Sequence, residues 1–172
     1  MAEIKDRILP VGIQSFEEIR KKGYLYVDKT DIIWQLANRG RKYNYLNRPR
    51  RFGKSVLVDT LQAYFEGRKE LFEGLKIMDL ETEWTKHPVI RLDMSRAESS
   101  AHELNAYLNQ AFKEYEQKYN IETSPSDSLT NRFDAIIQSA YQQTGQQVAI
   151  LVDEYDSPLQ HSWKTPHHEE CT

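Results

Sequence analysis

The chain has 172 residues, of which 39% are hydrophobic and 28% charged, enough for one domain with a buried core. Its 23 basic and 26 acidic residues leave a net charge of −3, which argues against a dedicated nucleic-acid-binding domain. No apolar run could span a bilayer, and the single cysteine, Cys171, excludes an internal disulfide. We therefore expect a cytoplasmic protein with no membrane partner.

The first forty residues predict short helices joined by tight turns. Ser15 and Glu18 have the spacing of a capping box, in which the serine accepts from the third amide of a helix. A second helix is expected to begin at Asp28 or Thr30 and to stop at Gly40. Residues 42–47 then predict a strand, because they are rich in tyrosine and leucine.

A phosphate-binding loop is predicted directly after that strand. The sequence Arg48-Pro49-Arg50-Arg51-Phe52-Gly53-Lys54-Ser55 fits the pattern of glycine, four free positions and Gly-Lys-Ser/Thr, except that Arg48 replaces the first glycine. Residues 54–66 then predict a helix. Amides at a helix N-terminus point outward, and the helix dipole favours negative charge there, so a strand–loop–helix context suits a triphosphate.

Each residue of the Gly-Lys-Ser triplet suits a contact with phosphate or Mg²⁺. Gly53 has no side chain to block phosphate oxygens, Lys54 can neutralise the β- and γ-phosphates, and the Ser55 hydroxyl can ligate Mg²⁺. The predicted nucleotide-binding residues are Arg50, Arg51, Phe52, Gly53, Lys54, Ser55 and Val56. The alternative is an ordinary helix start, with Arg50 and Arg51 solvated or in salt bridges.

The second half of the chain alternates strands and helices. A strand is predicted over residues 89–93, a helix after Ser100, a helix over 129–143 and a strand over 147–152. Such alternation is typical of an α/β fold with a parallel sheet flanked by helices.

Two acids, Asp153 and Glu154, directly follow the last strand. Asp153 can hold the magnesium shell, and Glu154 can act as a general base that activates the attacking water. A cap or a solvated loop is the alternative for an Asp-Glu pair. A phosphate loop and a strand-end acid in this order predict a site for ATP and Mg²⁺, with Glu154 and Lys54 as catalytic residues and Ser55 and Asp153 as metal ligands.

The chain resembles the bacterial AAA-ATPase-like proteins. The resemblance rests on an ordered series of motifs covering almost the whole chain: Pro10-Val11-Gly12-Ile13-Gln14-Ser15-Phe16, Tyr26-Val27-Asp28-Lys29-Thr30, the loop Arg48–Ser55, and Val152-Asp153-Glu154-Tyr155-Asp156. It implies that Arg48 is a feature of the family. It also implies a P-loop NTPase fold, commonly followed by a restriction-endonuclease-like nuclease domain.

The resemblance further implies that the ATPase fold is incomplete at its C-terminus. We expect residues 1–41 to be a helical N-terminal segment, 42–156 a partial P-loop core and 157–172 a polar tail. A central strand, a sensor residue, an arginine finger and the nuclease domain are not recognisable, so weak or absent hydrolysis and self-association are expected. The alternatives are a nucleotide-binding or protein-interaction module with little turnover, and a nucleic-acid-associated fragment. In the last case, nucleic acid would be bound only through the nuclease domain.

Overall fold

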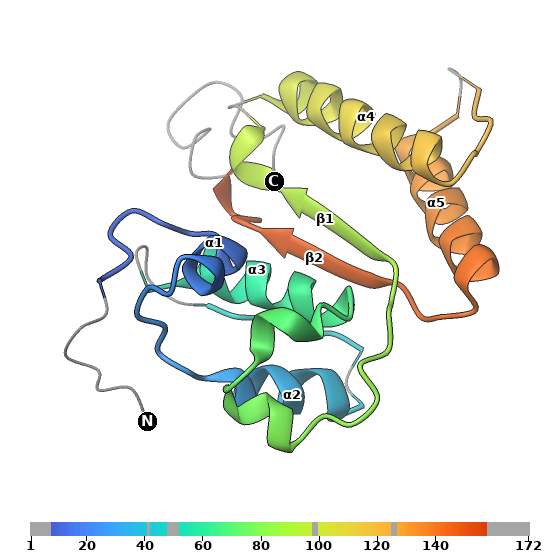
Figure 1. Cartoon of the computed structure of the whole chain (residues 1–172). Coiled ribbons are helices and arrows are strands. Elements are labelled where there is room, and N and C mark those ends of the chain that lie inside the picture. Colours follow the sequence, from blue (N-terminus) through green and yellow to red (C-terminus); the bar gives the residue numbers. More distant parts are fainter. Residues whose placement is uncertain (1–7, 41, 48–51, 98–99, 125–126, 158–172) are drawn as a thin grey trace. The chain divides into compact units, whose positions relative to one another are not determined.

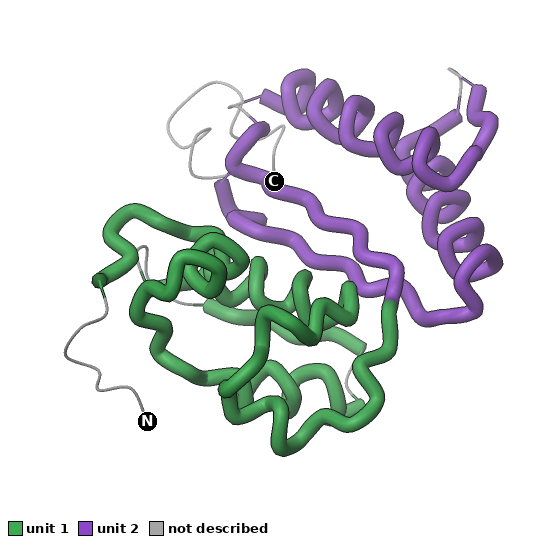
Figure 2. The backbone as a smooth tube through the Cα atoms, in the orientation of Figure 1, with its two compact units in different colours: residues 1–86 green, residues 87–172 purple. Residues whose placement is uncertain are grey.

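The computed structural model of the chain describes residues 8–40, 42–47, 52–97, 100–124 and 127–157 (Figure 1). The chain divides into two compact units, residues 1–86 (unit 1) and 87–172 (unit 2), which Figure 2 distinguishes by colour. The predicted division into residues 1–41, 42–156 and 157–172 rests on function rather than on compactness, and it stays a prediction.

The described elements of unit 1 are all helical. They are α1 (Phe16–Lys21), α2 (Thr30–Asn38), α3 (Lys54–Phe65) and the short 3-10 helices η2 (Lys69–Phe72) and η3 (Lys76–Asp79). The predicted cap at Ser15 is confirmed, because its side chain accepts from the Glu18 amide. At α2 the cap residue is Lys29, while the Asp28 carboxylate accepts from both the amide and the hydroxyl of Thr30.

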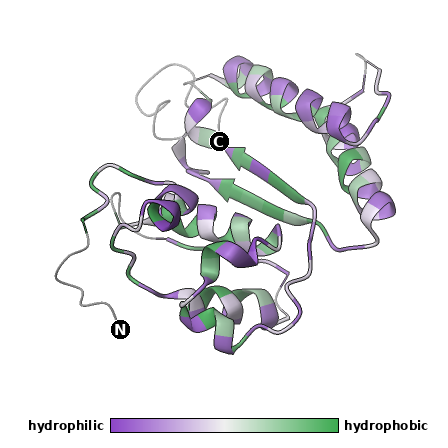
Figure 3. Ribbon diagram, viewed as in Figure 1, coloured by the Kyte–Doolittle hydropathy of each residue, from purple (hydrophilic) through white to green (hydrophobic). Residues whose placement is uncertain are grey.

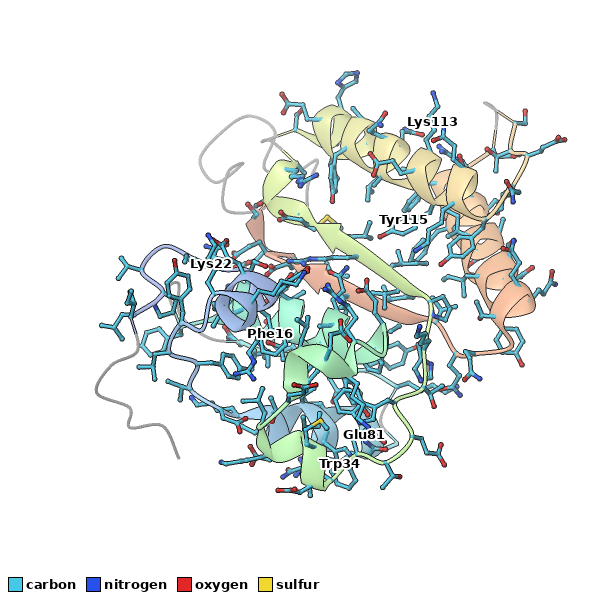
Figure 4. The ribbon with its side chains drawn as sticks, in the orientation of Figure 1. Phe16, Lys22, Trp34, Glu81, Lys113 and Tyr115 are labelled. Carbon is cyan, nitrogen blue, oxygen red and sulfur yellow. The ribbon has the colours of Figure 1, made fainter. Side chains whose placement is uncertain are left out.

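The core of unit 1 is built around aromatic rings. Phe16 and Phe72 are fully buried, with ring centroids 5.0 Å apart, and the Phe72 ring also lies 5.0 Å from that of Trp84. Figure 4 labels Phe16 on α1 and Trp34 on α2, which both belong to this core. The remaining buried members are aliphatic: Ile33, Ala63, Leu71, Leu75 and Ile77.

The strand predicted over residues 42–47 is wrong, because these residues form no strand in the structure. All six are exposed, Tyr43 by 90% and Tyr45 by 70% of their surface. Tyrosine and leucine favour strands only where a neighbouring strand and a packed face are present, so the local pattern could not secure the strand alone.

Unit 2 combines two strands with two long helices. Strand β1 (Val89–Asp93) is followed by the 3-10 helix η4 (Met94–Arg96), helix α4 (Ala101–Lys118), helix α5 (Leu129–Thr144) and strand β2 (Ala149–Asp153). β1, α5 and β2 agree with their predicted ranges within two residues, and α4 begins directly after Ser100 as predicted. Ser100 and Ser128 cap α4 and α5, and Gly145 ends α5 in the left-handed conformation.

β1 and β2 pair in parallel and in register from Val89↔Ala149 to Asp93↔Asp153. Ile90 and Leu92 point to one face of the pair, where they join a core with residues of α4 and α5. Ile150 and Val152 share that face by register but stay 43% and 40% exposed. Figure 3 shows β2 as hydrophobic along most of its length.

The outer edge of β1 is covered by tyrosine hydroxyls. The Tyr115 hydroxyl accepts from the Arg91 amide at 2.7 Å and donates to the Arg91 carbonyl at 3.2 Å, and the Tyr107 hydroxyl accepts from the Asp93 amide at 2.8 Å. Figure 4 labels Tyr115, whose side chain extends from α4. Within the described residues, β2 has only β1 as a partner strand. The expected self-association stays a prediction.

The structure therefore confirms an α/β class with a parallel pair of strands, while the P-loop arrangement of the whole sheet stays a prediction. Among the helices in the described ranges, none has the length and apolar character needed to cross a membrane.

Candidate functional site

The first part of the candidate site is the beginning of α3. Gly53 occupies the N-cap position in the left-handed conformation, with φ 73° and ψ 25°. The first intrahelical bond joins the Leu57 amide to the Gly53 carbonyl at 3.0 Å, so the amides of Ser55 and Val56 have no acceptor within the helix. No side chain caps α3 and its first turn holds no acid, whereas α1, α4 and α5 each begin with a capping serine.

Packing and hydrogen-bond contacts within unit 1 hold the body of α3 in place, and they thereby position its first turn. Leu57 and Leu61 pack against the aromatic core. The Asp59 carboxylate accepts from the Phe16 amide at 2.6 Å, which ties α3 to the first turn of α1. Thr60 is fully buried, and its hydroxyl donates to the Val56 carbonyl at 2.7 Å.

The structure describes some of the other predicted nucleotide-binding residues and leaves others outside its described ranges. Lys54, Ser55 and Val56 are half-buried in the first turn of α3, and Phe52 is 64% exposed just before it. Arg50 and Arg51 lie outside the described residues, as does Arg48. The structure thus supplies the helix end of the predicted loop.

The second part of the candidate site is the carboxyl end of β2. Asp153 is the last strand residue and is 6% exposed, and its Oδ1 accepts from the Glu154 amide at 3.0 Å. Glu154 has φ 48°, an uncommon conformation for a residue with a side chain, and its carbonyl accepts from the Ser157 amide. The chain therefore turns sharply directly after the buried carboxylate.

Two residues of β1 that the sequence analysis did not select lie beside Asp153. Asp93 is its register partner, and the Asp93 Oδ1 accepts from the amide and the hydroxyl of Ser95. The Arg91 guanidinium lies 3.9 Å from the Asp153 Oδ2. The signal for Asp93 was present, because it too is an acid at the end of a predicted strand, but the register that joins the strands could not be read from the sequence.

The predicted residues therefore form two sets. Gly53, Lys54, Ser55 and Val56 belong to unit 1, whereas Asp153 and Glu154 belong to unit 2. The prediction that Ser55 and Asp153 share one magnesium ion joins residues of two units that are described separately, and it stays a prediction.

Comparison with known proteins assigns the family. The family described as "Predicted AAA-ATPase" matches residues 10–172, which is nearly the entire chain. The chain belongs to the AAA-ATPase-like family. The match includes both α3 with its Gly-Lys-Ser start and the Asp-Glu pair at the end of β2, as the resemblance implied. No comparison shows the nuclease domain that the resemblance implied.

A relative from Azotobacter chroococcum mcd 1, named "Uncharacterized protein in vnfD 5'region", is 39% identical over 154 residues. The aligned region covers 88% of this chain and 29% of the relative, so this chain spans less than a third of the relative's length. No solved structure matches the chain. Family membership supports nucleotide binding in general, and the ligand and the reaction are matters for proposal.

Proposed function

We propose that this AAA-ATPase-like chain binds ATP with Mg²⁺ and that the first turn of α3 holds the phosphates. The observation that carries the proposal is the start of α3, where Gly53 replaces a capping side chain and Lys54 and Ser55 follow. Amides without an intrahelical acceptor, the positive end of the helix dipole and a lysine together suit a polyphosphate. Arg50, Arg51 and Phe52 would extend the contact from the loop.

The end of β2 supplies the groups that suit a divalent cation. Mg²⁺ prefers hard oxygen ligands and is commonly held by one or two carboxylates together with substrate phosphates. Asp153 offers such a carboxylate at the carboxyl end of a parallel strand, where ligands of α/β folds bind. When bound, magnesium would neutralise the charge that develops on the phosphates. Asp153 and the Ser55 hydroxyl are the residues that would hold it.

In this proposal Glu154 accepts a proton from the attacking water, and Lys54 stabilises charge on the phosphates. The second candidate function is a nucleotide-binding or interaction module with little turnover. The substitution Glu154→Gln separates the two. It should leave ATP affinity within about twofold and abolish the weak phosphate release of the parent chain if Glu154 is the base, because the amide keeps the size of the side chain but cannot take the proton. A parent chain that binds ATP and releases no phosphate would favour the second candidate.

The proposed phosphate site is tested with two matched glycine substitutions. Gly53 and Gly145 both have left-handed backbones, with φ of 73° and 66°, and an added Cβ would meet no atom within 4 Å at either position. Gly53→Ala and Gly145→Ala should therefore cost similar stability, about 1–2 kcal/mol each from backbone strain. Only Gly53→Ala should weaken ATP binding, since only there would the new methyl group face the phosphates.

The measurement is ATP titration by calorimetry with magnesium present, alongside chemical denaturation of both variants. A Gly53→Ala variant that binds ATP as tightly as the Gly145→Ala variant would contradict the placement of the phosphates at α3.

A further inference from the structure

The two strands of unit 2 contain an ion pair, Arg91 and Asp153, whose cation has no part in the proposed function. Arg91 and Asp153 come from neighbouring strands, and the Arg91 Nη2 lies 3.9 Å from the Asp153 Oδ2. The Arg91 side chain is 29% exposed, whereas that of Asp153 is only 7% exposed. A carboxylate so deeply buried needs a compensating charge or hydrogen bonds, because burial of an unpaired charge is costly.

The sheet geometry holds this pair in place. Arg91 and Asp93 alternate with Ile90 and Leu92 along β1, so they point to the face of the sheet opposite the α4–α5 core. Asp153 is in register with Asp93 and therefore points to the same face. The backbone of Arg91 is fixed by two hydrogen bonds with the Tyr115 hydroxyl, so the start of its side chain is well defined.

The neighbouring acid has partners of its own. Asp93 accepts two hydrogen bonds from Ser95, and its Oδ2 lies 3.7 Å from the Arg96 Nε. Arg96 therefore pairs with Asp93. In the described part of the chain, Arg91 is the cation that lies within 4 Å of the Asp153 carboxylate.

We propose that Arg91 is the counter-ion of Asp153 in the metal-free protein and that it competes with Mg²⁺ for this carboxylate. The inference rests on the proposed magnesium role of Asp153. A guanidinium near one carboxylate oxygen stabilises the buried charge when no cation is bound, and it repels a divalent cation that approaches the same oxygen. Arg91 would therefore act as a positioning residue that sets the strength of magnesium binding without touching the nucleotide.

The first test is a double-mutant cycle in metal-free buffer. Arg91→Gln should lower the midpoint of thermal unfolding by about 2–4 °C in the parent chain, as expected for a modest loss in a domain of this size. In the Asp153→Asn background the same substitution should have less than half that effect, because the charge it compensates is gone. Arg91→Lys keeps the charge and serves as the matched control. An equal loss in both backgrounds would overturn the pairing.

The second test measures ATP affinity in magnesium chloride and in EDTA, and takes the ratio as the gain due to magnesium. The ratio for Arg91→Gln should exceed that of the parent by about threefold or more, while Arg91→Lys should stay within about twofold of the parent. If the parent gains from magnesium but Arg91→Gln has the same ratio, the competition is refuted and the proposed function stands. If the parent binds no ATP under either condition, both are refuted.

Discussion

In unit 1 the candidate phosphate site lies at the beginning of a helix, whereas in unit 2 the candidate acids lie at the end of a strand. The helix end is held by an aromatic core and by the Asp59 contact with the Phe16 amide. The strand end is held by its register with β1, and the Arg91 guanidinium lies 3.9 Å from its carboxylate. The two halves of one predicted site thus depend on different interactions, and substitutions in one unit should leave the other intact.

The largest expected effect is that of Phe72→Ala in unit 1. Phe72 is fully buried and contacts the rings of Phe16, Tyr64 and Trp84. Its truncation should cost about 3–5 kcal/mol, through lost burial and a cavity. Hydrogen exchange should report the loss of protection in α1 and α3 first. Equal loss of protection in β1 and β2 would contradict independent support of the two halves.

Arg132→Met should produce the corresponding loss in unit 2. The Arg132 Nε donates to the Glu116 carboxylate at 2.6 Å, and both side chains are about one-tenth exposed. This hydrogen bond also lowers the pKa of Glu116. Removal of the guanidinium leaves a buried carboxylate without its counter-ion, at a cost of about 3 kcal/mol.

A second substitution separates the charge effect from packing. Glu116→Leu added to Arg132→Met should restore part of the stability in urea denaturation, because no unpaired charge then remains buried. A double variant less stable than Arg132→Met alone would refute this explanation.

A smaller effect is expected at the outer edge of β1. Tyr115→Phe removes the hydroxyl that bonds to the amide and carbonyl of Arg91, which should cost about 1–2 kcal/mol. Tyr141→Phe is the matched control, because Tyr141 is 53% exposed on α5. Faster exchange of the Arg91 amide should accompany the loss, and equal stabilities of the two variants would show that water replaces the hydroxyl at no cost.

The smallest effect concerns the half-buried pair of Glu17 and Arg68 in unit 1, whose charged atoms lie 2.7 Å apart. The hydrogen bond from Arg68, aided by Lys21, lowers the pKa of Glu17 from 4.5 to about 2. Because the folded pKa is the lower one, this contribution is present above pH 4.5 and is lost as the pH falls toward 2. Glu17→Gln should therefore flatten the acid side of the stability profile, and an unchanged slope between pH 4.5 and 2 would exclude the pair as a contributor.

The sequence alone predicted the elements whose signals are local. The serine cap at Ser15, the helix that begins at Lys54 and the helix that begins at Leu129 depend on neighbouring residues, and all are present. The strand over residues 42–47 failed because a strand also needs a partner that no local pattern can supply. The Arg91–Asp153 pair was missed for a related reason, since it exists only through the register of two strands 60 residues apart.

The central claim is that α3 receives the phosphates of ATP, and Lys54→Ala tests it most directly. The substitution removes the charge meant for the β- and γ-phosphates, and a charged hydrogen bond contributes about 1.5–3 kcal/mol, so ATP affinity in magnesium should fall at least about tenfold. Lys69→Ala, on η2 of the same unit, removes the same charge elsewhere and should bind like the parent chain. Calorimetric titration that finds equal affinity for Lys54→Ala and the parent would contradict the claim.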